Sequence, residues 1–168
     1  MRRIPGGPVD MLRLVLALAL SLSATSALAC SFDVGGPYEP GVVTGDIAIG
    51  DIPRPILSDA HLTRGTEPPG SSCDDAGTLS FRVGLPDGFE PGIGEFGLLL
   101  DVVEGDDAYH IFPDVPIALR SDEGGGTARV FFAWLDGAPR DHVRLKMTVE
   151  VRFVYGTRQG PPGAFRIE

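Results

Sequence analysis

The sequence is poor in the residue types that perform most enzyme chemistry. Its 168 residues include two cysteines, three histidines and one tryptophan, and Lys146 is the single lysine. The nucleophile-elbow pattern G-x-S-x-G, a phosphate-binding loop and the zinc motif H-E-x-x-H are all missing. The histidines lie far apart, and the cysteines stand in no C-x-x-C or H-x-x-x-H spacing that would indicate zinc. These absences predict a protein that is not an enzyme, with no catalytic residue, no cofactor and no metal site.

The chain also lacks an apolar run long enough to cross a bilayer, which takes about 20 residues. Its most apolar segment, residues 12–22, is interrupted by Arg13 and follows the basic residues Arg2 and Arg3. A short apolar run behind a basic start is typical of an export signal. We therefore predict a helical signal peptide over residues 1–29.

Small residues at the end of this segment predict where the signal is cut. Ala27 and Ala29 form the A-x-A cleavage pattern, and cleavage after Ala29 would leave Cys30 as the first mature residue. Met11 is an alternative start, because the segment after it is a compact signal by itself. The other interpretation is a membrane anchor that is never cleaved, and the small-residue end favours cleavage. The mature chain of about 139 residues is long enough for one domain.

Cys30 has two competing interpretations. A lipoprotein signal usually has a branched apolar residue three positions before the cysteine, where this chain has Ala27, and Leu28 stands one place too late. Export brings the chain into an oxidising compartment, where a disulfide between Cys30 and Cys73 is the default. That bond would close a loop of about 44 residues and contribute roughly 4 kcal/mol to stability. We favour the disulfide; a lipid on Cys30 is the alternative, because a lipidated sulfur cannot pair with Cys73.

Basic residues are scarce in the mature chain. The signal peptide holds three of the 14 basic and one of the 23 acidic residues, which leaves 11 basic and 22 acidic residues and a net charge of −11. A nucleic-acid backbone needs a basic surface, and anionic lipid attracts basic residues. We therefore exclude nucleic acid and expect membrane contact only through the signal peptide or a lipid on Cys30. The expected partner is an unknown protein or envelope component in the periplasm or outside the cell, or at the outer membrane for a lipid-anchored protein.

Patterns typical of β-structure dominate the mature chain. Residues 30–53 are rich in Gly, Pro and Asp and predict an irregular N-terminal arm. Residues 54–168 carry short apolar or alternating segments separated by turn residues. The predicted strands cover residues 56–62, 78–85, 95–103, 127–136, 143–155 and 164–168. Pro113 and Pro116 restrict their segment to an edge strand or an irregular path, because proline cannot donate to a sheet ladder.

The strongest pattern lies in residues 143–155. Every second residue from Val143 to Tyr155 is apolar, and only Val154 departs from the polar alternation between them. A helix cannot place positions two apart on one face, whereas a strand must. About seven strands with no convincing helix predict an all-β fold, an antiparallel β-sandwich.

The run from Trp134 to Glu168 resembles the last strands of a fibronectin type III or immunoglobulin-like domain. In that family a long alternating strand leads through a glycine-containing hairpin to a short terminal strand, as residues 143–155, the turn GTRQGPPG and the segment AFRIE do here. The resemblance is carried mainly by residues 127–168 and implies one such sandwich over residues 54–168. It also implies a recognition, spacer or structural module.

The two parts of the mature chain differ in charge. Residues 30–128 carry 18 acidic and 4 basic residues, whereas residues 129–168 carry 4 acidic and 7 basic residues. Strand alternation predicts that four basic residues share one outward face: Arg144, Lys146, Arg152 and, from the neighbouring strand, Arg166. One interpretation is a soluble face whose charges discourage edge pairing. The other is a docking face for an acidic partner or a second copy of the molecule.

Two further functions would use the acidic residues. The segment DVVEGDD (residues 101–107) offers oxygen ligands for calcium, but the D-x-D-x-D-G spacing is missing, so we favour a solvated loop. A hydrolytic or carbohydrate-active sandwich enzyme would need paired carboxylates about 5–10 Å apart in a cleft. We therefore expect a non-catalytic binding or structural module of the bacterial periplasm or cell surface. A lipid-anchored envelope protein of the same fold is the alternative.

Overall fold

The structure is a computed structural model that describes residues 35–42, 47–66, 73–123 and 125–168. The predicted signal peptide, its cleavage site at Ala27 and Ala29, and Cys30 therefore lie outside the described residues. None of the described helices is long and apolar enough to cross a membrane.

The regular elements of the described chain are strands and single-turn 3₁₀ helices. The strands are β1 (Ile56–Thr63), β2 (Ala76–Gly84), β3 (Gly97–Gly105), β4 (Ile117–Ala118), β5 (Thr127–Leu135), β6 (Met147–Tyr155), β7 (Arg158–Gln159) and β8 (Gly163–Ile167). The 3₁₀ helices are η1 (Pro40–Val42), η2 (Ile49–Asp51), η3 (Cys73–Asp75), η4 (Ile93–Glu95) and η5 (Pro139–Asp141).

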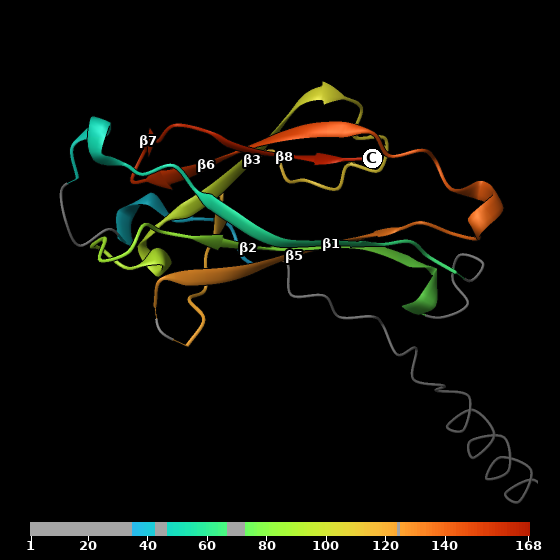
Figure 1. Ribbon diagram of the computed structural model, residues 1–168, viewed down its shortest axis with the longest axis horizontal. Helices are drawn as coiled ribbons and strands as arrows, with labels where there is room; N and C mark the ends of the chain where they lie inside the picture. The colour runs from blue at the N-terminus through green and yellow to red at the C-terminus, as the bar shows by residue number, and fades with distance from the viewer. Residues whose placement is uncertain (1–34, 43–46, 67–72, 124) are drawn as a thin grey trace, which may run out of the picture. The chain divides into compact units, whose positions relative to one another are not determined.

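The strands form two antiparallel sheets (Figure 1). One sheet has the order β1-β2-β5. In the other, β4, β3 and β6 are neighbours in that order, and β7 and β8 pair with β6. The prediction of an all-β fold with antiparallel sheets is confirmed. The segment that contains Pro113 and Pro116 leads into β4, an edge strand of two residues.

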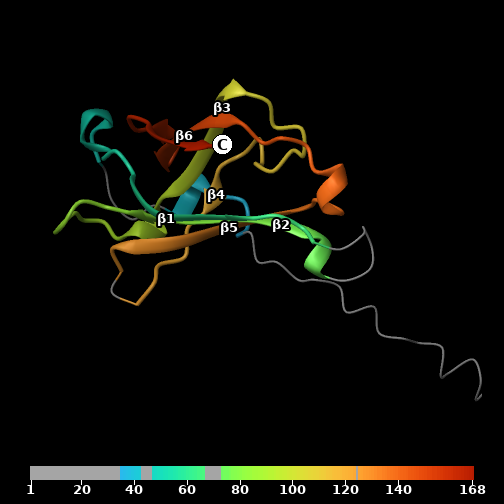
Figure 2. The ribbon, with the colours of Figure 1, turned by 45° about the vertical axis from the view of Figure 1, so that its right-hand side comes forward.

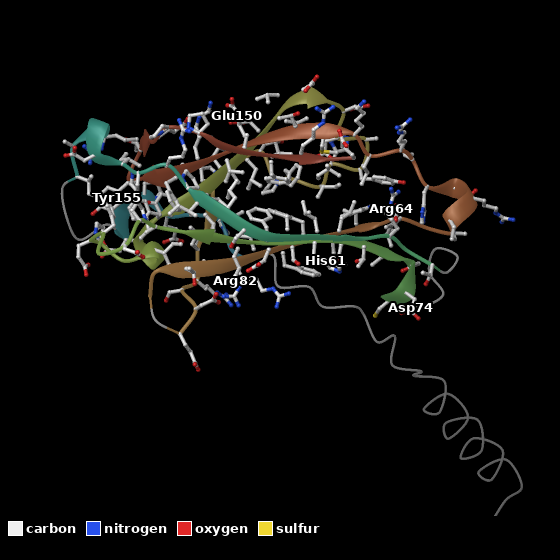
Figure 3. All side chains as sticks on the ribbon, viewed as in Figure 1. His61, Arg64, Asp74, Arg82, Glu150 and Tyr155 are labelled. Atoms are coloured by element: carbon white, nitrogen blue, oxygen red, sulfur yellow. The ribbon has the colours of Figure 1, made fainter. Side chains whose placement is uncertain are left out.

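The two sheets form two layers with one hydrophobic core between them (Figure 2). Phe81 of β2 contacts Phe165 of β8 across this core, with ring centroids 5.1 Å apart. Phe81 and Phe153 are at most 1 % exposed, because strand alternation turns them inward. Arg82 and Glu150 point away from the core on the outer sides of the two layers (Figure 3). The predicted alternation therefore separates core from solvent as expected.

The long alternating strand is shorter than the sequence predicts. β6 begins at Met147, so residues 143–146 lie outside it although the alternation starts at Val143. Met147 pairs with Gly105 at the end of β3 and with Ile167 at the end of β8. Since both neighbouring strands end at this level, the described chain offers residues 143–146 no strand to pair with.

The N-terminal arm packs on the domain. Val154, the apolar exception on the polar face of β6, pairs with Gly97 of β3. A Cβ on Gly97 would lie 2.5 Å from Cγ of Tyr38, so the tyrosine ring lies directly on this face of the sheet. Val154 beside it is 5 % exposed, and Ile47 and Ile52 of the arm are buried in the core. The arm therefore contributes to the hydrophobic interior.

Candidate functional site

An apolar groove lies where the segment after β3, the N-terminal arm and β5 meet. Its volume is about 390 Å³. Four lining side chains are buried: Ile111, Phe112, Ile117 and Phe132. Pro37 and Val115 line it as exposed residues, and Val115 is 56 % exposed. A mostly apolar concave surface of this kind is typical of a binding site.

The segment after β3 is held in place by Asp107. Its carboxylate accepts hydrogen bonds from the backbone N–H groups of Ile111 (2.8 Å) and Phe112 (3.2 Å). His110, directly before Ile111, has φ of +50°, a conformation that few residues other than glycine adopt. The Phe112 ring meets Phe132 of β5 edge-on, with centroids 5.2 Å apart. This wall of the groove is therefore fixed by both hydrogen bonds and packing.

Backbone hydrogen bonds fix the wall on the arm's side. The N–H of Ala118 donates to the carbonyl of Gly36, and the N–H of Tyr38 donates to the carbonyl of Pro116, each at a distance of 2.8 Å. Pro37 lies between these two bonds in an antiparallel bridge to β4. Because protein hydrogen bonds and ring packing hold both walls, the groove is preformed.

A second cluster, the Asp136 cluster, consists of Arg64, Gly65, Trp134 and Asp136 at one end of the domain. The Asp136 side chain is fully buried. Arg64 donates from Nε (2.6 Å) and Nη2 (2.7 Å) to the two carboxylate oxygens. The backbone N–H of Gly65 (2.8 Å) and the indole N–H of Trp134 (3.1 Å) donate to the same carboxylate. Figure 3 shows Arg64 at the end of the domain where β5 leads toward β6.

The surroundings of Asp136 keep it ionised. Burial by itself would raise the pKa of its carboxyl, but the hydrogen bonds from Arg64, Gly65 and Trp134 outweigh burial and lower this pKa to about 2. The same bond to Asp136 raises the pKa of the Arg64 guanidinium. Four hydrogen-bond donors meet a carboxylate that has about four acceptor positions. No acceptor position of Asp136 is therefore left with which it could act as a base or nucleophile.

The Asp136 cluster joins segments far apart in the sequence. Nη2 of Arg64 also donates to the carbonyl of Val143 (3.0 Å), whose N–H donates to the Tyr109 hydroxyl (3.0 Å). The backbone N–H of Asp136 donates to the carbonyl of Asp75 in η3 (3.0 Å). The cluster therefore connects the ends of β1 and β5 with η3 and with the segment before β6, and its role is structural.

Two of the predicted docking residues, Arg152 and Arg166, lie on strands and have carboxylate partners. Arg152 donates to Asp101 (3.0 Å) and to Glu150. Nε of Arg166 lies 2.8 Å from a carboxylate oxygen of Glu168. Neighbouring carboxylates therefore offset the charge of both guanidinium groups.

The other two, Arg144 and Lys146, are exposed and precede β6. Lys146 and Arg166 line a shallow hollow of about 160 Å³ together with Glu104. The structure thus brings Lys146 and Arg166 together but does not place all four basic residues on one strand face. The docking face stays a prediction.

Cys73 begins η3 and is exposed. Its predicted partner Cys30 lies outside the described residues, so the disulfide stays a prediction. In the described ranges, no group of three or more His, Cys, Asp or Glu residues could hold a metal ion. Two acidic residues at the end of β3 and after it bond to protein groups: Thr148 donates to Glu104 (3.0 Å), and Asp107 accepts from two backbone amides.

Sequence reasoning missed both the groove and the Asp136 cluster. Pro113 and Pro116 indicated an irregular segment, but nothing in the pattern showed that it would line a groove with β5. Asp136 was visible only as the residue that ends a strand before Gly137. Its partner Arg64 is 72 positions away, a separation that no local pattern reveals.

The chain matches no protein-family model, no curated protein and no solved structure. A function therefore has to follow from the groove, the charges and the fold.

Proposed function

We propose that the protein is an exported, non-catalytic binding module of the bacterial periplasm or cell surface, built on one immunoglobulin-like sandwich. The observation that carries this proposal is the preformed apolar groove, in which Val115 stays 56 % exposed. An exposed apolar side chain at the wall of a fixed concavity favours binding over a purely structural role.

The strand order supports the immunoglobulin-like assignment. In such sandwiches the first, second and fifth strands share one sheet, and the third, sixth and last strands share the other. Here β1, β2 and β5 form one sheet, and β3, β6 and β8 belong to the other. β4 joins the second sheet beside β3.

The ionisable groups favour binding without catalysis. His110 is the one ionisable side chain among the residues that line the groove. The buried carboxylate of Asp136 is not among them, and its acceptor positions are occupied by Arg64, Gly65 and Trp134. Glycoside hydrolysis needs a positioned pair of carboxyl groups, and none of the residues that line the groove is Asp or Glu.

The binding role is tested by titrating the mature protein with N-acetyl-phenylalaninamide and following its amide resonances by NMR. We expect saturable shifts at Ile111, Phe112 and Ile117, which line the groove. Val115→Ser should raise Kd about threefold, since it removes apolar contact area. The matched control is Val103→Ser, because Val103 is 53 % exposed and does not line the groove. Absence of saturable shifts at the groove amides would overturn the binding role.

Export is tested separately by the intact mass of the protein isolated from its host. We expect a chain that starts at Cys30 and is two hydrogens lighter than the reduced form, as the Cys30–Cys73 disulfide requires. A mass increased by a diacylglyceryl group would replace the disulfide with the lipid-anchored alternative. A mass that still contains residues 1–29 would contradict export with cleavage.

A further inference from the structure

We propose that the natural occupant of the groove is a segment of another protein that presents one bulky apolar side chain with a Lys or Arg close by on one side. This inference rests on the proposed function and adds the chemistry of the partner. It is carried by the size and lining of the groove together with the charges at its rim.

The size and lining of the groove favour a single apolar side chain. Its 390 Å³ is at the low end of the range of about 300–1,000 Å³ for small-ligand sites. His110 is the one polar side chain in the lining. A sugar needs several convergent hydrogen-bonding groups, whereas an aromatic or aliphatic side chain needs apolar contact.

One side of the rim carries the acidic residue Asp114. Residues 83–119 contain eight Asp or Glu residues and no Lys or Arg. Asp114 lies between Pro113 and Val115, which both line the groove, and Asp114 is exposed. Asp114 has no hydrogen bond or ion pair within the part of the chain that the structure describes.

Basic residues line a hollow next to the groove. A neighbouring hollow shares Gly35 and Ile117 with the groove and is lined by Arg120 and Arg129. A basic residue of the partner is therefore favoured next to Asp114 and opposed next to this hollow. An extended chain rises about 3.3 Å per residue, so a base one or two positions from the apolar side chain can reach the acidic rim.

The experiment compares three peptides that differ in one charge: acetyl-Lys-Gly-Phe-amide, acetyl-Gly-Gly-Phe-amide and acetyl-Glu-Gly-Phe-amide. Binding to the mature protein is followed by NMR at 10 mM and at 1 M salt. At low salt we expect the lysine peptide to bind about fivefold more tightly than the glycine peptide, and the glutamate peptide to bind more weakly. The differences should fall below about twofold at 1 M salt, where the Debye length is about 3 Å instead of 30 Å.

Variants assign the charge effect to the rim. Asp114→Asn should reduce the preference for the lysine peptide over the glycine peptide from about fivefold to below about twofold. Asp87→Asn is the matched control, because Asp87 is exposed and does not line the groove. This control should change neither the preference for the lysine peptide nor the affinity for the glycine peptide.

The outcomes separate this inference from the proposed function. If the three peptides bind equally and Val115→Ser weakens all of them, the groove binds but its partner is not basic, and the inference is overturned. If the lysine preference persists in Asp114→Asn, the rim does not select the base, and the inference is also overturned. If none of the peptides binds, the proposed function fails with it.

Discussion

Replacing Asp136 by asparagine should destabilise the protein far more than its single-atom change suggests. Four hydrogen-bond donors meet this carboxylate, two from Arg64 and one each from Gly65 and Trp134, and Nε2 of His142 lies 3.3 Å from Oδ2. An asparagine amide has one acceptor oxygen and one donor NH₂ group. Whichever way it turns, its NH₂ group faces donors, and the Arg64 guanidinium loses its counter-charge.

The magnitude follows from two independent routes. The pKa of Asp136 falls from 3.8 to about 2, and at about 1.36 kcal/mol per pKa unit its charge contributes roughly 2 kcal/mol at neutral pH. Removing one partner of a buried ion pair costs about 3–5 kcal/mol. Arg64 is 27 % exposed and can recover some hydration, which lowers that figure. We therefore expect Asp136→Asn to reduce the free energy of unfolding by about 2–4 kcal/mol.

Urea unfolding of the mature protein at pH 7 measures this change, with the slope m as the check on two-state behaviour. The matched control is Asp141→Asn, which removes the same charge from an exposed pair with Arg140. The control should change the free energy by less than about 0.5 kcal/mol. If Asp136→Asn also stays within that limit at unchanged m, the reasoning about the buried carboxylate is refuted.

The same carboxylate predicts the sign of a pH effect. Folding lowers the pKa of Asp136, so its contribution is fully present above the unfolded-state value of 3.8 and is lost as the pH falls toward about 2. The stability difference between the wild type and Asp136→Asn should therefore be constant from pH 5 to 7 and shrink between about pH 4 and 2. A difference that grows on acidification would contradict the assigned pKa shift.

Two further predictions concern the contacts of single residues. Gly77→Ala should reduce the free energy of unfolding by about 1–3 kcal/mol, because the new Cβ would lie 2.2 Å from Cε2 of Trp134. The control is Gly84→Ala on the same strand, where the nearest atom would be 3.5 Å from the Cβ, and it should cost less than about 1 kcal/mol. Equal effects of the two variants in urea unfolding would contradict the clash. Tyr38→Phe removes the hydroxyl that accepts a hydrogen bond from the N–H of Gly156 at 2.8 Å. It should reduce the free energy of unfolding by about 1 kcal/mol and speed hydrogen exchange of the Gly156 amide. An unchanged exchange rate would show that the arm does not protect this amide.

The strands could be located from the sequence because their signal is local. Residues 79–83 and 147–153 alternate between apolar and polar side chains, and this alternation follows from the two-residue period of an extended chain. The start of β6 could not be located in this way. The alternation continues back to Val143, but β3 and β8 both end at the level of Met147. A strand needs a partner, and the ends of the partners are set elsewhere in the chain.

The apparent exception at Val154 has the same kind of explanation. The alternation places Val154 on the solvent side of β6, and the Tyr38 ring covers that side at Gly97. The sequence near Val154 does not predict contact with the Tyr38 ring, which precedes it by more than a hundred residues. The predicted basic face is also changed by a distant residue. Arg152 lies on β6 as predicted, but it donates a hydrogen bond to Asp101 of β3.

The sequence by itself determined the acidic composition, the approximate positions of most strands and the lack of a recognised catalytic or metal motif, and it predicts an export signal. These properties depend on composition and on periods of a few residues, which any short window displays. The tertiary structure alone decided that Arg64, Trp134 and Asp136 meet, and that the segment around Pro113 lines a groove against Phe132. Such sites arise when distant segments converge, and their convergence is set by sheet order and core packing rather than by any local pattern.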